Sequence, residues 1–335
     1  MFIFLGHEDV PVDVSYRRLK GETHVMQRIH IPRYRKAGVK FVVMATGGDP
    51  VRPFGTAGFR TQTMGAFKYL DDMFAEVDEA PDEMMIIRSA SDFQDALNSD
   101  KIGIILHFEG GTPLDGQVFM LRSFYRVGLR SMQPAWYFRN ELADSGAEAS
   151  PGGLSRFGRM VVEEMNRLGM VIDVSHLSEA SAMDVVKASR DPIMASHSNA
   201  KTIRDHYRNV SDDLIRAIAE KNGIIGVVLC PPFVSTGAAT MDDLLDHIDH
   251  IKRLVGVGHI ALGPDFIDYA QELITGEVSA KTGKVAPETG FPVGLETVCE
   301  LPHLSGGLAS RGYSTAEIAL IMGGNLLRLF QEILK

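Results

Sequence analysis

The chain has 335 residues, of which 45% are hydrophobic, so it can bury a large core and is not expected to be disordered. Its formal net charge of −9 argues against a nucleic-acid-binding surface, because binding to phosphates needs clustered lysines and arginines. Two cysteines, Cys230 and Cys299, are too few for a disulfide framework and favour a reducing, cytoplasmic location.

Eight short β-rich runs alternate along the chain with longer amphipathic segments. The first run follows directly on Met1 with no preceding basic residue, which predicts a strand rather than a signal peptide. No stretch approaches about 20 apolar residues, so we expect no membrane span and no membrane partner. The predicted strands are residues 2–5, 41–45, 102–108, 129–134, 170–174, 193–196, 224–230 and 260–263.

The segments between these runs predict helices with recognisable ends. An apolar stripe from Phe157 to Leu168 ends at Gly169, a residue type that favours the left-handed C-terminal cap. Ser211 and Thr240 are good N-caps for two further helices, the second of which ends at Gly256. Residues Ser314 and Glu317 have the spacing of a capping box.

The alternation of strands and helices predicts one α/β domain over residues 1–335, a (β/α)₈ TIM barrel, with a doubly wound open sheet as the alternative. Two long interruptions, residues 47–100 and 268–302, separate the predicted elements. The second is rich in glycine and poor in apolar residues, so we expect long loops over the C-terminal mouth of the barrel.

Residues that can bind metals cluster at the C-terminal ends of the predicted strands. In a closed parallel barrel these ends meet at one face, where such enzymes carry their chemistry. The six residues in these positions are His7, Asp9, Glu109, His176, His197 and Asp265.

Imidazole and carboxylate ligands suit zinc, and also manganese, cobalt or iron. Three histidines and two carboxylates exceed the needs of one catalytic zinc, so they predict two divalent ions, with Glu109 as the bridging carboxylate. Asp265 is then the candidate general base and proton shuttle.

Each of these residues also has a structural interpretation when taken alone, since a histidine or aspartate at a strand end often only makes hydrogen bonds. Their joint placement is what favours a metal centre. His247 and His250 lie on the flank of a predicted helix, so we expect them on the solvated surface, and we expect His107 to pack in the core.

Several motifs resemble those of the renal (membrane) dipeptidase family of the amidohydrolase superfamily. The resemblance runs from His7 to Arg328 and is most specific between Phe157 and His176. The motifs are Gly6-His7-Glu8-Asp9, Phe108-Glu109-Gly110-Gly111, Asp173-Val174-Ser175-His176, Ser196-His197-Ser198-Asn199, Arg208-Asn209 and Gly263-Pro264-Asp265-Phe266.

The resemblance implies a binuclear, usually zinc, hydrolase of dipeptides that is commonly a homodimer. It implies that one ion is bound by the histidine and aspartate of the first motif and the other by the two later histidines, with Glu109 as the bridge. Asp265 would contact the substrate amine, and Arg208 would pair with the terminal carboxylate, for which its planar guanidinium is suited.

The chain departs from the family at Trp136, which stands where many members carry a histidine that contacts the substrate carbonyl. An indole donates through one N–H only, so Trp136 either supplies that hydrogen bond or reshapes the pocket for another substrate. A third interpretation is an aromatic residue that only packs at the rim of the mouth.

The function expected from these features is hydrolysis of dipeptides, including those of L-Xaa-D-Xaa type, by attack of a metal-bound hydroxide on the peptide carbonyl. The alternative is a related amidohydrolase that acts on N-acyl amino acids, lactones or cyclic amides. A barrel that binds peptide or metal without turnover is the least favoured hypothesis, because no ligand of the set is missing.

Overall fold

The computed structural model describes residues 1–49, 61–268 and 291–335. Most of the predicted loop at residues 268–302 therefore lies outside the described residues, as do residues 50–60. Among the helices of the described ranges, none combines the length and the apolar character that crossing a bilayer requires.

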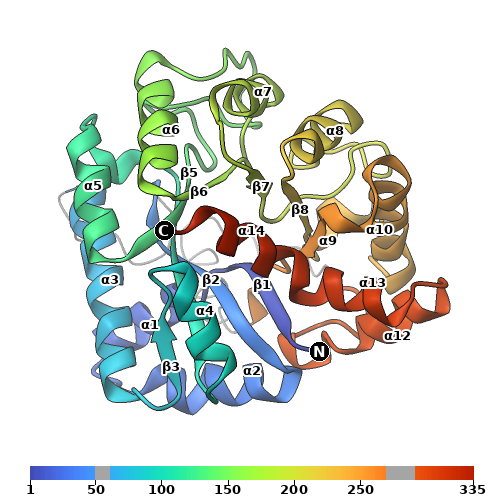
Figure 1. Ribbon diagram of the computed structural model, residues 1–335, viewed down its shortest axis with the longest axis horizontal. Coiled ribbons are helices and arrows are strands. Elements are labelled where there is room, and N and C mark those ends of the chain that lie inside the picture. Colours follow the sequence, from blue (N-terminus) through green and yellow to red (C-terminus); the bar gives the residue numbers. More distant parts are fainter. Residues whose placement is uncertain (50–60, 269–290) are drawn as a thin grey trace, which may run out of the picture.

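Eight parallel strands close into a barrel, as predicted (Figure 1). Strand β1 pairs with β2 on one side and with β9 on the other, and the additional pairing of β2 with β4 closes the ring. The strands of the barrel are β1 (Ile3–Glu8), β2 (Val39–Gly48), β4 (Ile102–Glu109), β5 (Leu129–Gln133), β6 (Val171–Asp173), β7 (Ile193–Ala195), β8 (Ile224–Val227) and β9 (Ile260–Leu262).

The interruption at residues 47–100 contains elements that the sequence did not reveal. Helices α3 (Gln62–Glu79) and α4 (Ala90–Leu97) flank a ninth strand, β3 (Met84–Ile86). Strand β3 lies outside the ring and pairs in parallel with the first residues of β4, where Met84 faces Ile102. Three residues are too short for an alternating pattern, so no sequence signal marked this strand.

Helices surround the barrel, and their predicted ends are confirmed. The hydroxyl of Ser211 accepts a hydrogen bond from the amide of Leu214, and Gly169 adopts φ 77° after the last turn of its helix. Thr240 is an N-cap as predicted, in a capping box with Asp243, and the predicted capping box of Ser314 and Glu317 is formed. The remaining helices and helical turns are α1 (Val10–Leu19), η1 (Met26–His30), α2 (Ile31–Ala37), η2 (Thr112–Leu114), α5 (Val118–Val127), α6 (Arg156–Leu168), α7 (Glu179–Ala188), α8 (Asp212–Glu220), α9 (Pro231–Val234), α10 (Met241–Val255), η3 (Val257–His259), η5 (Val298–Glu300), α12 (His303–Ser310), α13 (Thr315–Ala319), η6 (Leu320–Gly324) and α14 (Asn325–Ile333).

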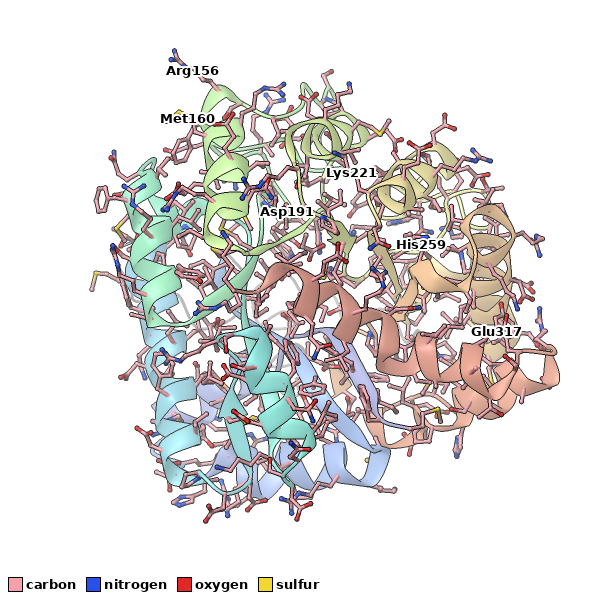
Figure 2. All side chains as sticks on the ribbon, viewed as in Figure 1. Arg156, Met160, Asp191, Lys221, His259 and Glu317 are labelled. Atoms are coloured by element: carbon pink, nitrogen blue, oxygen red, sulfur yellow. The ribbon has the colours of Figure 1, made fainter. Side chains whose placement is uncertain are left out.

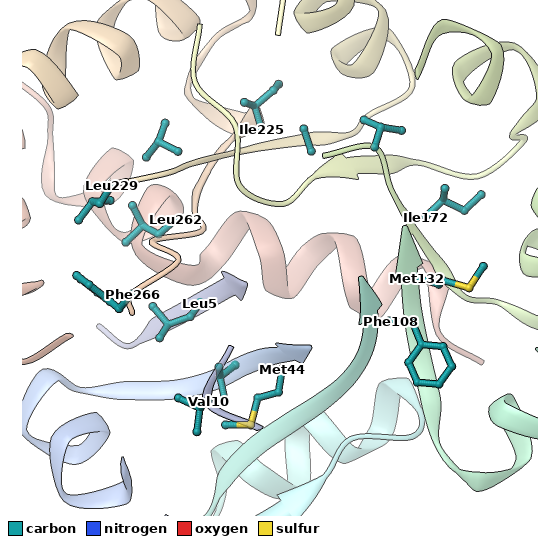
Figure 3. Packing of buried hydrophobic residues seen from close by; sticks show 14 of the residues in the cluster. Leu5, Val10, Met44, Phe108, Met132, Ile172, Ile225, Leu229, Leu262 and Phe266 are labelled. Atoms are coloured by element: carbon teal, nitrogen blue, oxygen red, sulfur yellow. The ribbon is translucent and has the colours of Figure 1, made fainter. Parts of the chain in front are cut away.

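Two buried clusters use alternate residues of the strands. One packs strands against the surrounding helices and includes Leu5, Met44 and Phe108 (Figure 3). The other joins Phe4 and Phe41 to Phe330 of α14, which crosses the strands in Figure 1. On the outer face, by contrast, side chains such as Arg156 project from α6 into solvent (Figure 2). The interior packing fixes the strands and hence the positions of their ends.

The prediction that His247 and His250 are solvated is wrong. His247 on α10 is fully buried; its Nδ1 accepts from the amide of Ala200 and its Nε2 donates to the carbonyl of Val234. Nε2 of His250 lies 2.8 Å from Oδ1 of Asp212 in α8. Because α10 packs against α8, α9 and α12, its flanks are covered by neighbours that the helical pattern alone does not show.

We expect Gly226→Ala to destabilise the barrel. A β-carbon at Gly226 would lie 2.0 Å from the carbonyl oxygen of Ser196 in the neighbouring strand connection, which neither backbone can relieve without moving. We expect a loss of about 3 kcal/mol, at the upper end of overpacking effects, measured as a lower midpoint of urea unfolding.

The matched control is Gly306→Ala in α12, where no atom of the described residues lies within 4 Å of the added carbon apart from the adjacent residues and the helix's own backbone. Alanine is the better helix former, so this variant should be unchanged or slightly more stable. Equal midpoints for the two variants would contradict the close approach at Gly226.

Candidate metal centre

Six side chains that the strand-end pattern singled out lie together at the mouth of the barrel. His7 is in β1 with Asp9 just after it, and Glu109 ends β4. His176, His197 and Asp265 follow the ends of β6, β7 and β9. The strand ends thus bring residues far apart in sequence to one place, as a parallel barrel requires.

One carboxylate oxygen stands at the centre of the group. Oε1 of Glu109 lies 3.0 Å from Nε2 of His176, and 3.5 Å from Nε2 of both His197 and His7. The Nε2 atoms of His176 and His197 are themselves 2.9 Å apart. Three imidazoles therefore point their nitrogens at the same carboxylate.

A second group shares His7. Its Nε2 lies 3.5 Å from Oδ1 of Asp9 and 3.8 Å from Oδ1 of Asp265. Possible ligand atoms of His7, Asp9 and Asp265 lie within 4.8 Å of one another, as do those of His7, Glu109 and His197. The two trios meet at His7, so the mouth offers two adjacent places for a cation.

Several ring nitrogens in this group have the surroundings expected of metal ligands. His7 is fully buried, yet neither of its ring nitrogens has a hydrogen-bond partner in the described structure, and Nδ1 of His176 is also without one. Buried polar atoms are normally paired, and imidazole with carboxylate is the donor set of borderline divalent ions. The residues present therefore fit the binding of such an ion.

Neighbouring side chains orient the histidines. Nδ1 of His197 lies 2.7 Å from the hydroxyl of Ser196, which in turn donates to buried Asp173. His107 packs edge-on against His7 with 5.7 Å between ring centroids, and its Nδ1 lies 3.0 Å from the hydroxyl of Ser131. Such outer contacts hold a ring nitrogen in the direction that a ligand needs.

The charges of the group perturb one another strongly. Burial raises the pKa of Glu109 well above its usual range, although His7 opposes the shift. Burial alone would lower the pKa of His7, but Glu109, Asp9 and Asp265 raise it to about 10. Burial also raises the pKa of Asp265 to about 6. The raised pKa values of His7, Glu109 and Asp265 mean that these groups hold protons more tightly than usual, at the place where their donor atoms suit a metal cation.

Two residues of the group have unusual backbone conformations. His176 has φ 66° and Asp265 has φ 59°, in the left-handed region that residues with a β-carbon rarely adopt. Such conformations cost on the order of 1 kcal/mol each and persist only where surrounding structure enforces them. Their occurrence at two strand ends within one group of candidate metal ligands is typical of a functional site.

Arg208 lies beside the group and is almost completely buried. Its Nη2 donates to the carbonyl of His197 at 3.3 Å, and its guanidinium lies over the ring of Phe233 at 5.3 Å. Nε and Nη1 have no partner among the described residues. The guanidinium therefore presents unused donors, which suit a carboxylate from outside the protein.

Trp136 lies at the rim, and its ring centroid is 5.9 Å from that of His176. Tyr137 follows it, and the hydroxyl of Tyr207 bonds that of Tyr137 at 3.1 Å. The half-buried indole of Trp136 is thus placed beside a candidate metal ligand. The backbone amide of Trp136 donates a hydrogen bond to the carboxylate of Asp49 at 2.9 Å.

Asp49 is a site residue that the sequence analysis missed. It follows β2, and its buried carboxylate accepts hydrogen bonds from the amide of Thr112 and from the side chain of Asn140, as well as from Trp136. It therefore joins the segment after Glu109 to the segment that carries Trp136. The strand-end rule that selected the other carboxylates applies equally to Gly47-Gly48-Asp49 and would have found it.

The chain is similar to known dipeptidases. A family model described as membrane dipeptidase (peptidase family M19) matches residues 1–282. Dipeptidase aclJ from Aspergillus oryzae is 31% identical over 318 residues, which cover 91% of this chain and 70% of that protein. Dipeptidase 3 from Rattus norvegicus is 32% identical over 270 residues, which cover 78% of this chain and 51% of that protein. The chain thus spans about half the length of the rat relative.

A similar solved structure is a metallo peptidase from Rhodobacter sphaeroides, liganded with a phosphinate mimic of the dipeptide L-Ala-D-Ala. It matches with a TM-score of 0.85 and 21% identity, over 99% of both chains. At this identity the match shows a shared fold.

We expect Asp49→Asn to loosen the segment that carries Trp136, because the new amide group cannot accept all the hydrogen bonds that the carboxylate receives. Trp136 is the only tryptophan in the chain, so intrinsic fluorescence reports on this segment directly. We expect emission at longer wavelength and stronger quenching by acrylamide. Asp71→Asn on the exposed face of α3 is the control, and a spectrum equal to that of the control would contradict this role of Asp49.

We expect binding of zinc to the metal-free protein to release protons. His7 has a raised pKa of about 10, so at pH 7 it carries a proton that a metal ligand must lose. The apparent association constant should therefore rise with pH between roughly pH 6 and 8. Calorimetry in buffers of different ionisation enthalpy measures the protons released, and a heat of binding independent of the buffer would contradict the expectation.

Proposed function

Because the chain belongs to the membrane dipeptidase family, we propose that it hydrolyses dipeptides with the help of two divalent metal ions, for which zinc is the first candidate. The proposed metal ligands are His7, Asp9, Glu109, His176 and His197. The observation that carries the proposal is the convergence of three imidazoles on one oxygen of Glu109, beside a second group of carboxylates.

The placement of Glu109 supports its role as the bridging ligand. Its Oε1 is within 3.5 Å of a nitrogen from His7, which belongs with Asp9, and of nitrogens from His176 and His197. Bound divalent ions lower the pKa of water and polarise a carbonyl, which is the chemistry that peptide hydrolysis needs.

Asp265 supplies proton transfer in this proposal. Its Oδ1 lies 3.8 Å from Nε2 of His7 and its side chain is 19% exposed, so the carboxylate is next to the metal ligands and partly open to solvent. With a pKa raised to about 6 by burial, it can accept a proton near neutral pH and return it to the leaving amine. The same carboxylate can also bind the free amino group of a substrate.

Arg208 defines the other end of the substrate. Its unused Nε and Nη1 can bind a carboxylate, and its Nη2 is already tied to the carbonyl of His197, one of the proposed ligands. A carboxylate held so close to the metal site leaves room for one residue between it and the scissile bond. This supports a dipeptide rather than an internal peptide bond as the substrate.

Dipeptides with an L- or a D-residue at the C-terminal position are both candidate substrates. The alternative class, N-acyl amino acids, lactones or cyclic amides, is motivated by Trp136, whose indole lies beside His176. An N-acyl amino acid would use Arg208 but would offer no free amine to Asp265.

We expect the zinc- or manganese-loaded protein to hydrolyse members of a panel of L,L and L,D dipeptides, and N-acetylation of the same dipeptides to abolish turnover. Arg208→Met should lower kcat/KM by about 30-fold or more, because a buried charge pair with the substrate is worth roughly 2 kcal/mol or more. Metal content, measured by elemental analysis, should be unchanged.

Arg156→Met, at an exposed position on α6, is the matched control and should retain full activity. Equal turnover of free and N-acetylated dipeptides would favour the alternative class. Absence of turnover of every dipeptide at micromolar enzyme would refute the proposed function.

A further inference from the structure

A cavity of about 190 Å³ opens beside the candidate metal centre, between the segments that follow β6 and β7. This is far more than the space that one water needs, so the cavity has room for a side chain of several heavy atoms. Both His176 and Arg208 line it. One cavity therefore adjoins a proposed metal ligand and the proposed carboxylate-binding residue.

This position assigns the cavity to one part of the substrate. If the C-terminal carboxylate binds Arg208 and the peptide carbonyl lies at the metal centre near His176, the α-carbon of the C-terminal residue lies between the two. Its side chain then faces the space that both residues border. The properties of that space determine which C-terminal residues fit.

The walls of the cavity are mixed, with an apolar part among polar and charged side chains. Val174, Leu177, Val210 and Leu214 line it, and all four are buried. Such walls suit the methylene groups of a side chain, because removing them from water is favourable. They do not by themselves select a charged or neutral end group.

The charges at the cavity favour an anionic end group. Lys201 lines it, and its backbone amide is fixed by a hydrogen bond to the carbonyl of Val210. Within the described part of the chain, the Lys201 ammonium makes one loose ion pair, 3.9 Å from the Asp205 carboxylate, which is 89% exposed. Glu179 also lines the cavity and keeps its negative charge, while its carboxylate is held by a hydrogen bond from the hydroxyl of Ser211.

We infer that this pocket selects substrates whose C-terminal residue carries an acidic side chain, with Lys201 as the specificity-determining residue. The inference rests on the proposed function, because it takes Arg208 as the site of the terminal carboxylate. A glutamate side chain places its methylene groups against the apolar walls and its carboxylate near the Lys201 ammonium. Glutamine has the same shape without the charge and is therefore the matched comparison.

The test compares kcat/KM for Ala-Glu and Ala-Gln, in the stereochemical series that the metal-loaded enzyme accepts. We expect Ala-Glu to be favoured about three- to fivefold, as a half-exposed ion pair allows, and more at low salt. Lys201→Met should remove the difference, and Lys201→Glu should reverse it in favour of Ala-Gln and Ala-Lys. Lys187→Glu, the same charge reversal at an exposed position of α7, should leave the preference unchanged.

A second readout does not depend on turnover. Free glutamate should bind the metal-loaded protein more tightly than free glutamine by calorimetry, and Lys201→Glu should abolish that difference. Dipeptide hydrolysis with the same Ala-Glu to Ala-Gln ratio in wild type and in Lys201→Glu would overturn the inference while leaving the proposed function intact. If no dipeptide is hydrolysed, the proposed function fails, and equal binding of glutamate and glutamine then overturns the inference as well.

Discussion

The repulsion among carboxylates at the barrel mouth is the constraint on which the rest of the site depends. Asp9, Glu109 and Asp265 all lie close to His7. The next residue, Glu8, is also buried, and its pKa is raised by burial and by Asp265. So much negative charge in a poorly hydrated space is costly unless positive charge accompanies it. Positive charge can come from the inward-facing imidazoles, from the buried guanidinium of Arg208 and from divalent ions that the donor set suits.

Most of the barrel and of the site was predictable because both follow from strand ends. All eight predicted runs overlap a barrel strand, and parallel closure then places the C-terminal ends of the strands at one face. That single geometric rule gathered six separate side chains without any knowledge of their contacts. Applied evenly, it would also have included Asp49, which follows β2 in the same way as Asp265 follows β9.

The features that escaped prediction depend on contacts between distant parts of the chain. Strand β3 exists because β4 offers free backbone groups beside it, and no pattern in three residues announces that. The burial of His247 results from the packing of α10 against its neighbours and from partners at Ala200 and Val234. Likewise, the role of Asp49 as a joint between two loops appears only when Thr112 and Trp136 are seen on the same carboxylate.

The left-handed backbone at His176 and Asp265 also bears on how this site can change over evolutionary time. Asparagine, aspartate, histidine and glycine tolerate such conformations, whereas valine, isoleucine and other branched residues are strongly disfavoured there. The backbone conformation at these two positions therefore limits accepted substitutions to a few polar residues or glycine. A descendant that lost its metal chemistry would be expected to keep that narrow residue choice as a trace of its origin.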